Sequence, residues 1–239
     1  MKLSFILLLI AFTFISSNNM IEKLIKVEKY ASKKTGLKII GELLLYDDFE
    51  PAFVAGILAN VFHDKKIGYL EKSDFSTNPE NEPEYLKIMD EKYNYRTKYS
   101  GKLVTDIPFQ DLRNLVDKLN KKKWKEGKFG LGSLQWRGKR TYTLTNLYNS
   151  ECGSCTKITE EEATSAEGKM IISELRGKTY EHIYKQWKER NTNLNSPQAA
   201  SDAGKQIAKE YEIEFNLGET DIKTRAKTAQ NMYNVMTSS

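Results

Sequence analysis

The segment GILANVFHDKKIG, residues 56–68, combines an apolar helical pattern with a titratable pair, His63 and Asp64. Upstream, Pro51 suits the first position of a helix, where its missing N–H is not needed. From there, apolar residues recur at the spacing of a helix face at Phe53, Val54, Ile57, Leu58, Val61 and Phe62. The pattern predicts a core helix that ends at the titratable pair.

Asp64 extends the core-facing row of this helix, because it lies seven residues after Ile57 and three after Val61. A carboxyl at the rim of an apolar face is partly desolvated, which raises its pKa and suits it to general acid catalysis. The alternative is a solvated carboxylate at the end of a helix. His63 lies above a stripe of small residues that includes Gly56, and such a stripe admits either another helix or a ligand.

A second informative segment is KFGLGSLQWRGKR, residues 128–140. Its glycines allow the backbone to approach a ligand closely. Gln135 supplies an amide donor and acceptor, Trp136 a flat apolar face, and Arg140 a planar set of donors. This combination suits an amino-sugar polymer, and a polar cleft residue such as Gln135 should contribute little to stability. The alternative is a tight loop in which Trp136 fills the core.

The first residues, MKLSFILLLIAFTFISSNN, have the charged start, apolar run and small-residue end of a secretory signal peptide. The apolar run from Leu3 to Ile15 is shorter than the roughly 20 residues that a membrane span requires. We therefore expect removal of residues 1–17, an extracellular location and no membrane attachment afterwards. A buried first helix is the alternative interpretation.

Two cysteines, Cys152 and Cys155, occur in the motif ECGSC. Such a motif forms a redox pair, half of a zinc site or a short disulfide. No second CxxC is present, and the other histidine, His182, is distant in the sequence. In an oxidising compartment we expect a disulfide that pins a loop. We expect neither a metal ion nor an organic cofactor.

The composition is that of an ordinary globular protein, with 39% hydrophobic and 29% charged residues. The formal net charge of +5 is too small to indicate nucleic acid binding, although it is compatible with an anionic polymer such as a bacterial cell wall. Helical patterns recur along the chain, and residues 36–41 form an apolar patch that fits either a strand or a turn. We expect one mainly α domain and a monomer.

Three sequence signals indicate where helices begin. Pro108 precedes a helical pattern, and Ser196 with Pro197 precedes another. Thr159 and Glu162 have the spacing of a capping box, in which each residue satisfies a backbone N–H of the other. These signals predict helices that start close to residues 109, 160 and 197.

Together, the two segments resemble the phage tail lysozyme family. Its pattern is a helix of the form VAGILGN, then three residues and a Glu, and later GxGLxQWxGxR. Residues 53–60, FVAGILAN, match the first part. Residues 129–140, FGLGSLQWRGKR, match the second, with a slightly different spacing between the glycines and Gln135. Matches to the family's second half follow in order at residues 167–175, 180–187 and Tyr211.

The resemblance implies a lysozyme-like α+β fold that is mainly α, with a small irregular or β portion around the Gly-rich loop. It implies a lysozyme-like domain over residues 47–237, and the amphipathic pattern upstream predicts an N-terminal helical extension over residues 18–46. It also implies a muramidase-like glycoside hydrolase that cleaves the glycan strand of bacterial peptidoglycan or a related amino-sugar polymer. The residues implied to line the saccharide site are Gly130, Gln135, Trp136, Gly138 and Arg140.

Asp64 stands where the family has its proposed general acid, a Glu. Asp is one methylene shorter, and a displacement of about 1 Å can cost about 100-fold in rate. The alternatives to an enzyme are therefore a degenerate, non-catalytic glycan-binding protein and a secreted interaction protein that keeps only the scaffold. The candidate accessory residues are His63, Glu71, Asp74 and Glu167, and the alternative for each is a side chain with no catalytic role.

Overall fold

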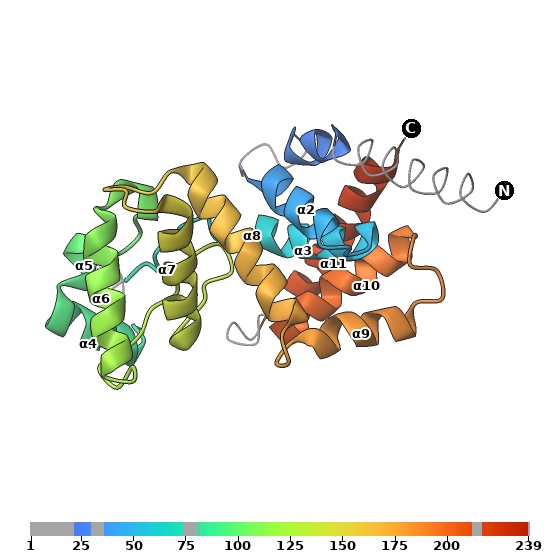
Figure 1. The fold of residues 1–239 in the computed structure, drawn as a ribbon. Coiled ribbons are helices and arrows are strands. Elements are labelled where there is room, and N and C mark those ends of the chain that lie inside the picture. Colours follow the sequence, from blue (N-terminus) through green and yellow to red (C-terminus); the bar gives the residue numbers. More distant parts are fainter. Residues whose placement is uncertain (1–21, 30–35, 74–79, 81, 212–216, 239) are drawn as a thin grey trace. The chain divides into compact units, whose positions relative to one another are not determined.

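The computed structural model describes residues 22–29, 36–73, 80, 82–211 and 217–238. The chain is mainly helical and divides into two compact units, whose elements are labelled in Figure 1. The first unit combines the chain up to His63 with the chain from Glu174 onward, and the second unit comprises Asp64–Ser173. The lysozyme-like domain predicted over residues 47–237 thus spans both units, a division that the sequence patterns did not reveal.

The predicted signal peptide, residues 1–17, lies outside the described residues. Within the described ranges, no helix has both the length and the hydropathy needed to cross a membrane.

The first unit consists of helices. They are α2 (Leu37–Tyr46), α3 (Pro51–His63), α9 (Glu181–Arg190), α10 (Pro197–Gln206), the π-helix η3 (Ile207–Tyr211) and α11 (Glu219–Thr237). Residues 22–29 are also helical. The expectation of a strand or turn at residues 36–41 is wrong, because this segment begins α2. The buried residues Leu37, Ile40 and Leu44 repeat at helical spacing, which the six-residue patch was too short to show.

Helix α3 is the predicted core helix, and every residue from Ala52 to Val61 is buried. Helices α2, α10 and α11 pack against it (Figure 1). A Cβ atom at Gly56 would lie only 2.5 Å from the Cβ of Ala203 in α10. The small residue at position 56 therefore admits another helix, which decides between the two interpretations of the small-residue stripe.

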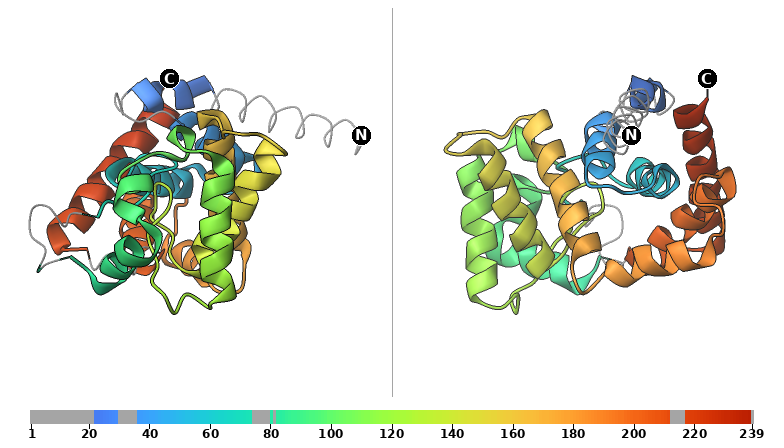
Figure 2. Two further views of the ribbon diagram at one scale, coloured as in Figure 1. Left: turned by 90° about the vertical axis from the view of Figure 1, so that its left-hand side faces the viewer. Right: turned by 45° about the vertical axis from the view of Figure 1, so that its right-hand side comes forward.

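The second unit contains α4 (Glu84–Tyr93), α5 (Tyr95–Lys98), the 3₁₀ helix η2 (Val104–Asp106), α6 (Phe109–Lys121), α7 (Lys139–Cys152) and most of α8 (Glu160–Arg176). Helices α6 and α7 lie side by side (Figures 1 and 2). Isolated β-bridges pair Tyr69 with Leu103, and Leu131 with both Leu70 and Trp136. The prediction of a mainly α protein with a small β portion at the Gly-rich loop is confirmed.

The predicted helix starts are also confirmed. Thr159 and Glu162 form the expected capping box, with the Glu162 N–H donating to Thr159 Oγ1 at 3.2 Å and the Thr159 N–H donating to Glu162 Oε2 at 2.8 Å. Ser196 Oγ accepts the N–H of Ala199 at 3.1 Å at the start of α10. Helix α6 begins directly after Pro108.

The predicted disulfide between Cys152 and Cys155 is present and lies at the end of α7.

Candidate functional site

Asp64 follows α3 directly and is the first residue of the second unit. Its side chain is half-buried, and its Oδ2 atom is shielded from solvent. The next residue, Lys65, donates its backbone N–H to the carbonyl oxygen of Ser133 at 3.1 Å. This hydrogen bond brings the end of the first motif to the Gly-rich segment of the second, although the two are far apart in the sequence.

His63 is the last residue of α3, and its imidazole contacts α11. Its Nε2 atom lies 2.7 Å from Thr228 Oγ1, and its ring meets that of Phe62 edge-on at a centroid distance of 5.0 Å. The imidazole therefore has a place in the packing of the first unit. A role for His63 in tuning Asp64 stays a prediction.

Residues 130–138 form a tight turn. Leu131 and Trp136 exchange two backbone hydrogen bonds, of 3.0 and 2.9 Å, and both Gly132 (φ 82°) and Gln135 (φ 52°) adopt positive φ between them. A Cβ atom at Gly132 would lie 2.8 Å from both Glu167 Oε1 and a ring carbon of Trp136. Glycine is therefore required at position 132 by both conformation and space.

The side chains of Gln135 and Trp136 are buried, at 3% and 0% exposure. Gln135 Nε2 donates to the carbonyl oxygens of Tyr69, at 3.1 Å, and Gly132, at 2.8 Å. Gln135 thus braces the turn, and its contribution to stability should be larger than the sequence led us to expect. Trp136 fills the core, as in the alternative interpretation. A saccharide-binding role for either residue stays a prediction.

Glu167, on α8, connects the two motifs through a fully buried carboxylate. Its Oε1 accepts the N–H of Gly68 at 2.7 Å and the hydroxyl of Tyr148 at 2.8 Å, and its Oε2 accepts the N–H of Ser133 at 2.9 Å. Burial raises the pKa of Glu167, while hydrogen bonds with Ser133, Gly68 and Tyr148 act in the opposite direction. Gly68 lies just after Asp64, so Glu167 holds both segments that border Asp64.

Glu71 anchors the start of the same Gly-rich turn. Its carboxylate accepts hydrogen bonds from the N–H of Gly130 at 2.8 Å, the hydroxyl of Tyr85 at 2.9 Å and Nη2 of Arg137 at 2.6 Å. The Arg137 guanidinium also lies over the Tyr85 ring, 5.2 Å from its centroid. Two donors from the Gly-rich turn and one from α4 therefore converge on Glu71.

The remaining predicted site residues are two glycines of the Gly-rich turn, an arginine of α7 and an aspartate. A Cβ atom at Gly130 would lie 2.7 Å from Gln135 Oε1, so position 130 has no room for a side chain. Gly138 has space around it but adopts a φ of 60°. Arg140 is half-buried in the first turn of α7. Asp74 lies outside the described residues.

Sequence reasoning missed four residues of this site. Ser133 and Arg137 lie inside the quoted Gly-rich segment, but no spacing pairs Arg137 with a carboxylate so far upstream. Tyr85 lies just before α4's apolar positions, and Tyr148 is one of 13 tyrosines in the chain. No local pattern distinguishes either of them as a partner of a buried or half-buried glutamate.

The arrangement offers one half-buried carboxylate, Asp64, beside a turn that two other carboxylates hold in place. A half-buried carboxyl can exchange a proton with a ligand that reaches it. Within the described part of the chain, no group of three or more His, Cys, Asp or Glu side chains is placed to hold a metal ion.

Comparison with known proteins identifies the family of the chain. The chain matches no curated protein and no solved structure. The family model for phage tail lysozyme matches residues 37–236, which includes α3, the Gly-rich turn and all helices from α2 to α10. The chain therefore belongs to the phage tail lysozyme family, a family of lysozyme-like peptidoglycan hydrolases.

Proposed function

We propose that this protein is a secreted glycoside hydrolase that cleaves the glycan strand of bacterial peptidoglycan, with Asp64 as its general acid. The observation that carries the proposal is the position of Asp64. It follows α3 where the family pattern has a Glu, and the neighbouring Lys65 is hydrogen bonded to Ser133 in the Gly-rich turn. A protonated carboxyl at this point delivers its proton to the leaving glycosidic oxygen.

Glycosidases generally use a second carboxylate as nucleophile or as the base that activates water. Glu167 is unsuited to either task, because it is fully buried and accepts three hydrogen bonds. Glu71 is unsuited because its carboxylate is engaged by Arg137, Tyr85 and a backbone N–H. We assign both glutamates the task of positioning the backbone around Asp64. Asp74 is then the sequence-based candidate for the second carboxylate.

The side chain of Asp64 is shorter than that of the family's Glu by one methylene, which withdraws the acid by about 1 Å. Misplacement of a catalytic group by that distance can cost about 100-fold in rate. The proposal therefore predicts slow hydrolysis by the natural chain. It also predicts that Asp64→Glu, which lengthens the side chain by one methylene, raises the rate of glycan hydrolysis. The increase should be up to about 100-fold if the short side chain is the sole cause of the slow rate.

A degenerate lysozyme that binds glycan without cleaving it is the second candidate function. The Asp at the position of the family's Glu favours it, whereas the inward orientation of Gln135 and Trp136, which leaves few of the predicted recognition groups exposed, counts against glycan binding. A scaffold that has lost glycan binding altogether is the third candidate, and binding measurements separate it from the other two.

The test measures both hydrolysis and binding on purified peptidoglycan, as reducing-end release and as co-sedimentation with insoluble wall. Asp64→Asn should abolish reducing-end release and leave co-sedimentation nearly unchanged, because the amide preserves shape but delivers no proton. The exposed Asp221→Asn on α11 is the matched control and should behave like the natural chain.

The alternatives give different outcomes in the same assay. A degenerate lysozyme co-sediments but releases no reducing ends with or without the Asp64 substitution, and a bare scaffold does not co-sediment. Reducing-end release that persists undiminished in Asp64→Asn would refute Asp64 as the acid.

A further inference from the structure

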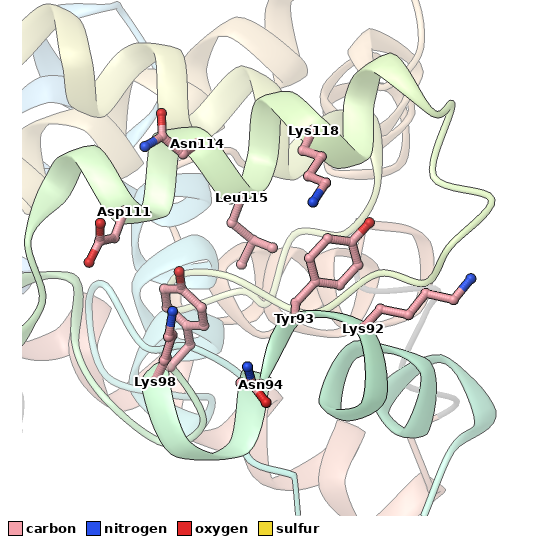
Figure 3. Close-up of a pocket in the computed structure, with 9 residues that line it drawn as sticks. Lys92, Tyr93, Asn94, Lys98, Asp111, Asn114, Leu115 and Lys118 are labelled. Carbon is pink, nitrogen blue, oxygen red and sulfur yellow. The ribbon is translucent and has the colours of Figure 1, made fainter.

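A hollow of about 340 Å³ lies in the second unit, between the junction of α4 with α5 and the facing side of α6 (Figure 3). Its lining residues are Lys92, Tyr93, Asn94, Lys98, Tyr99, Asp111, Asn114, Leu115 and Lys118. None of them belongs to the site around Asp64. The volume is within the range of small-molecule sites, at its lower end.

The rim of the hollow is positively charged. Three lysines and one aspartate line it, so its formal charge is 3 − 1 = +2. Lys98 comes from α5 and Lys118 from α6, so the two ammonium groups approach the hollow from opposite helices (Figure 3). Among the described residues, neither ammonium group forms a salt bridge, and that of Lys118 lies 5.2 Å from the centroid of the Tyr93 ring. The two cations are therefore available to an anion.

The Tyr93 ring is held in a fixed position at the hollow. Its hydroxyl donates to the carboxylate of Glu126, which also pairs with Lys122. Burial and this hydrogen bond raise the pKa of Tyr93 to about 12, so the hydroxyl stays protonated and keeps donating. Together with Leu115, the ring supplies the apolar part of the lining.

The amide side chains supply the remaining recognition groups. Asn114 accepts a hydrogen bond from Gln110 through Oδ1, which directs its NH₂ group to another partner. Asn94 adopts a left-handed conformation at the junction of α4 and α5, where its side chain lines the hollow. Amides and an apolar ring face are the groups that recognise the hydroxyls, acetamido groups and ring face of an amino sugar.

We propose that this hollow is an accessory binding site for an amino sugar that carries one carboxylate or phosphate group. Lys98 and Lys118 would hold the anion, Tyr93 the ring face of the sugar, and the two asparagines its polar substituents. The Asp111 carboxylate would accept hydrogen bonds from sugar hydroxyls. Its negative charge would disfavour a ligand that carries several negative charges close to Asp111. The inference goes beyond the proposed function, because binding here does not depend on the chemistry of Asp64.

The experiment is a titration of the ¹⁵N-labelled mature chain by NMR with three matched monosaccharides. They are neutral N-acetylglucosamine, N-acetylmuramic acid with its carboxylate, and N-acetylglucosamine 6-phosphate. At least one anionic sugar should shift the amides of residues 92–98 and 111–118 saturably, and bind about tenfold more tightly than the neutral sugar. Comparison of the two anionic sugars identifies which source of the negative charge the hollow prefers.

The double variant Lys98→Gln/Lys118→Gln should weaken anionic sugar binding about tenfold. The control Lys121→Gln/Lys125→Gln removes the same charge from exposed lysines that do not line the hollow, and should bind like the natural chain. Three outcomes would overturn the proposal. They are equal weakening of sugar binding by both double variants, equal amide shifts with inorganic phosphate alone, and no saturable shift with either anionic sugar. Hydrolysis of the cell wall by the Asp64 variants is measured in a separate assay. Loss of hydrolysis in that assay therefore does not change the conclusion about sugar binding at the hollow.

Discussion

Removal of the Glu167 carboxylate should destabilise the second unit, because three donors converge on it. In Glu167→Ala the N–H groups of Gly68 and Ser133 and the hydroxyl of Tyr148 lose their acceptor. Glu167 itself is fully buried, so the donors become unpaired in the protein interior. The substitution therefore tests whether this carboxylate holds together the segments that border Asp64.

The expected size of the effect follows from those contacts. A buried donor left unpaired costs about 1–3 kcal/mol, so three would cost about 3–9 kcal/mol. Loss of the desolvated charge and entry of water into the space offset part of this cost. We expect the free energy of unfolding to fall by about 3 kcal/mol. Glu167→Gln keeps one acceptor oxygen and should cost less than Glu167→Ala.

The assay is urea denaturation at pH 7, combined with hydrogen exchange at the amides of Gly68 and Ser133. Both amides should exchange faster in Glu167→Ala than in the natural chain, since they lose their acceptor. Glu161→Ala, in the exposed first turn of the same helix, is the control and should change stability by less than about 1 kcal/mol. If Glu167→Ala lies within 1 kcal/mol of the natural chain and both amides keep their protection, the reasoning is refuted.

The same residue predicts a pH dependence. The pKa of Glu167 in the folded protein is raised above its ordinary value of 4.5 by burial, so the folded state binds this proton more tightly than the unfolded chain does. The stabilisation from this proton is complete below the pKa that Glu167 has in the unfolded chain. It is lost as the pH rises through the pKa that Glu167 has in the folded protein. Relative to Glu167→Gln, which does not titrate, the natural chain should therefore lose stability as the pH rises from about 4.5.

Two further predictions concern the turn and the N-terminus. Gln135→Ala should lower the free energy of unfolding by about 2 kcal/mol, because the amide donates to two buried carbonyl oxygens. Gln135→Gly should be about 1 kcal/mol more stable than Gln135→Ala, since residue 135 adopts a φ of 52°, and equal stabilities in urea denaturation would contradict this argument. Expression in a secreting host should give a mature chain that begins near Asn18 or Asn19, as read from its intact mass. A secreted chain that still contains residues 1–15 would disprove the signal peptide.

The features that the sequence determined by itself are those that depend on residues close together in the chain. The apolar spacing from Phe53 to Phe62 identifies the core helix, and the Thr159–Glu162 spacing identifies the start of α8. The disulfide between Cys152 and Cys155 joins residues three apart. The two motifs also indicated the family, because each is a continuous stretch of sequence that can be recognised without the structure. Where the local signal was short, as at residues 36–41, the secondary structure was ambiguous.

The tertiary structure alone decided which residues distant in the sequence meet, and therefore what each side chain does. It placed Ala203 against Gly56, so the small-residue stripe admits a helix. It turned Gln135 inward and brought Glu167 to the backbone of both Gly68 and Ser133. The physical reason is that local spacing fixes the hydrogen bonds of a helix, whereas burial and the partner of a carboxylate depend on how separate segments pack.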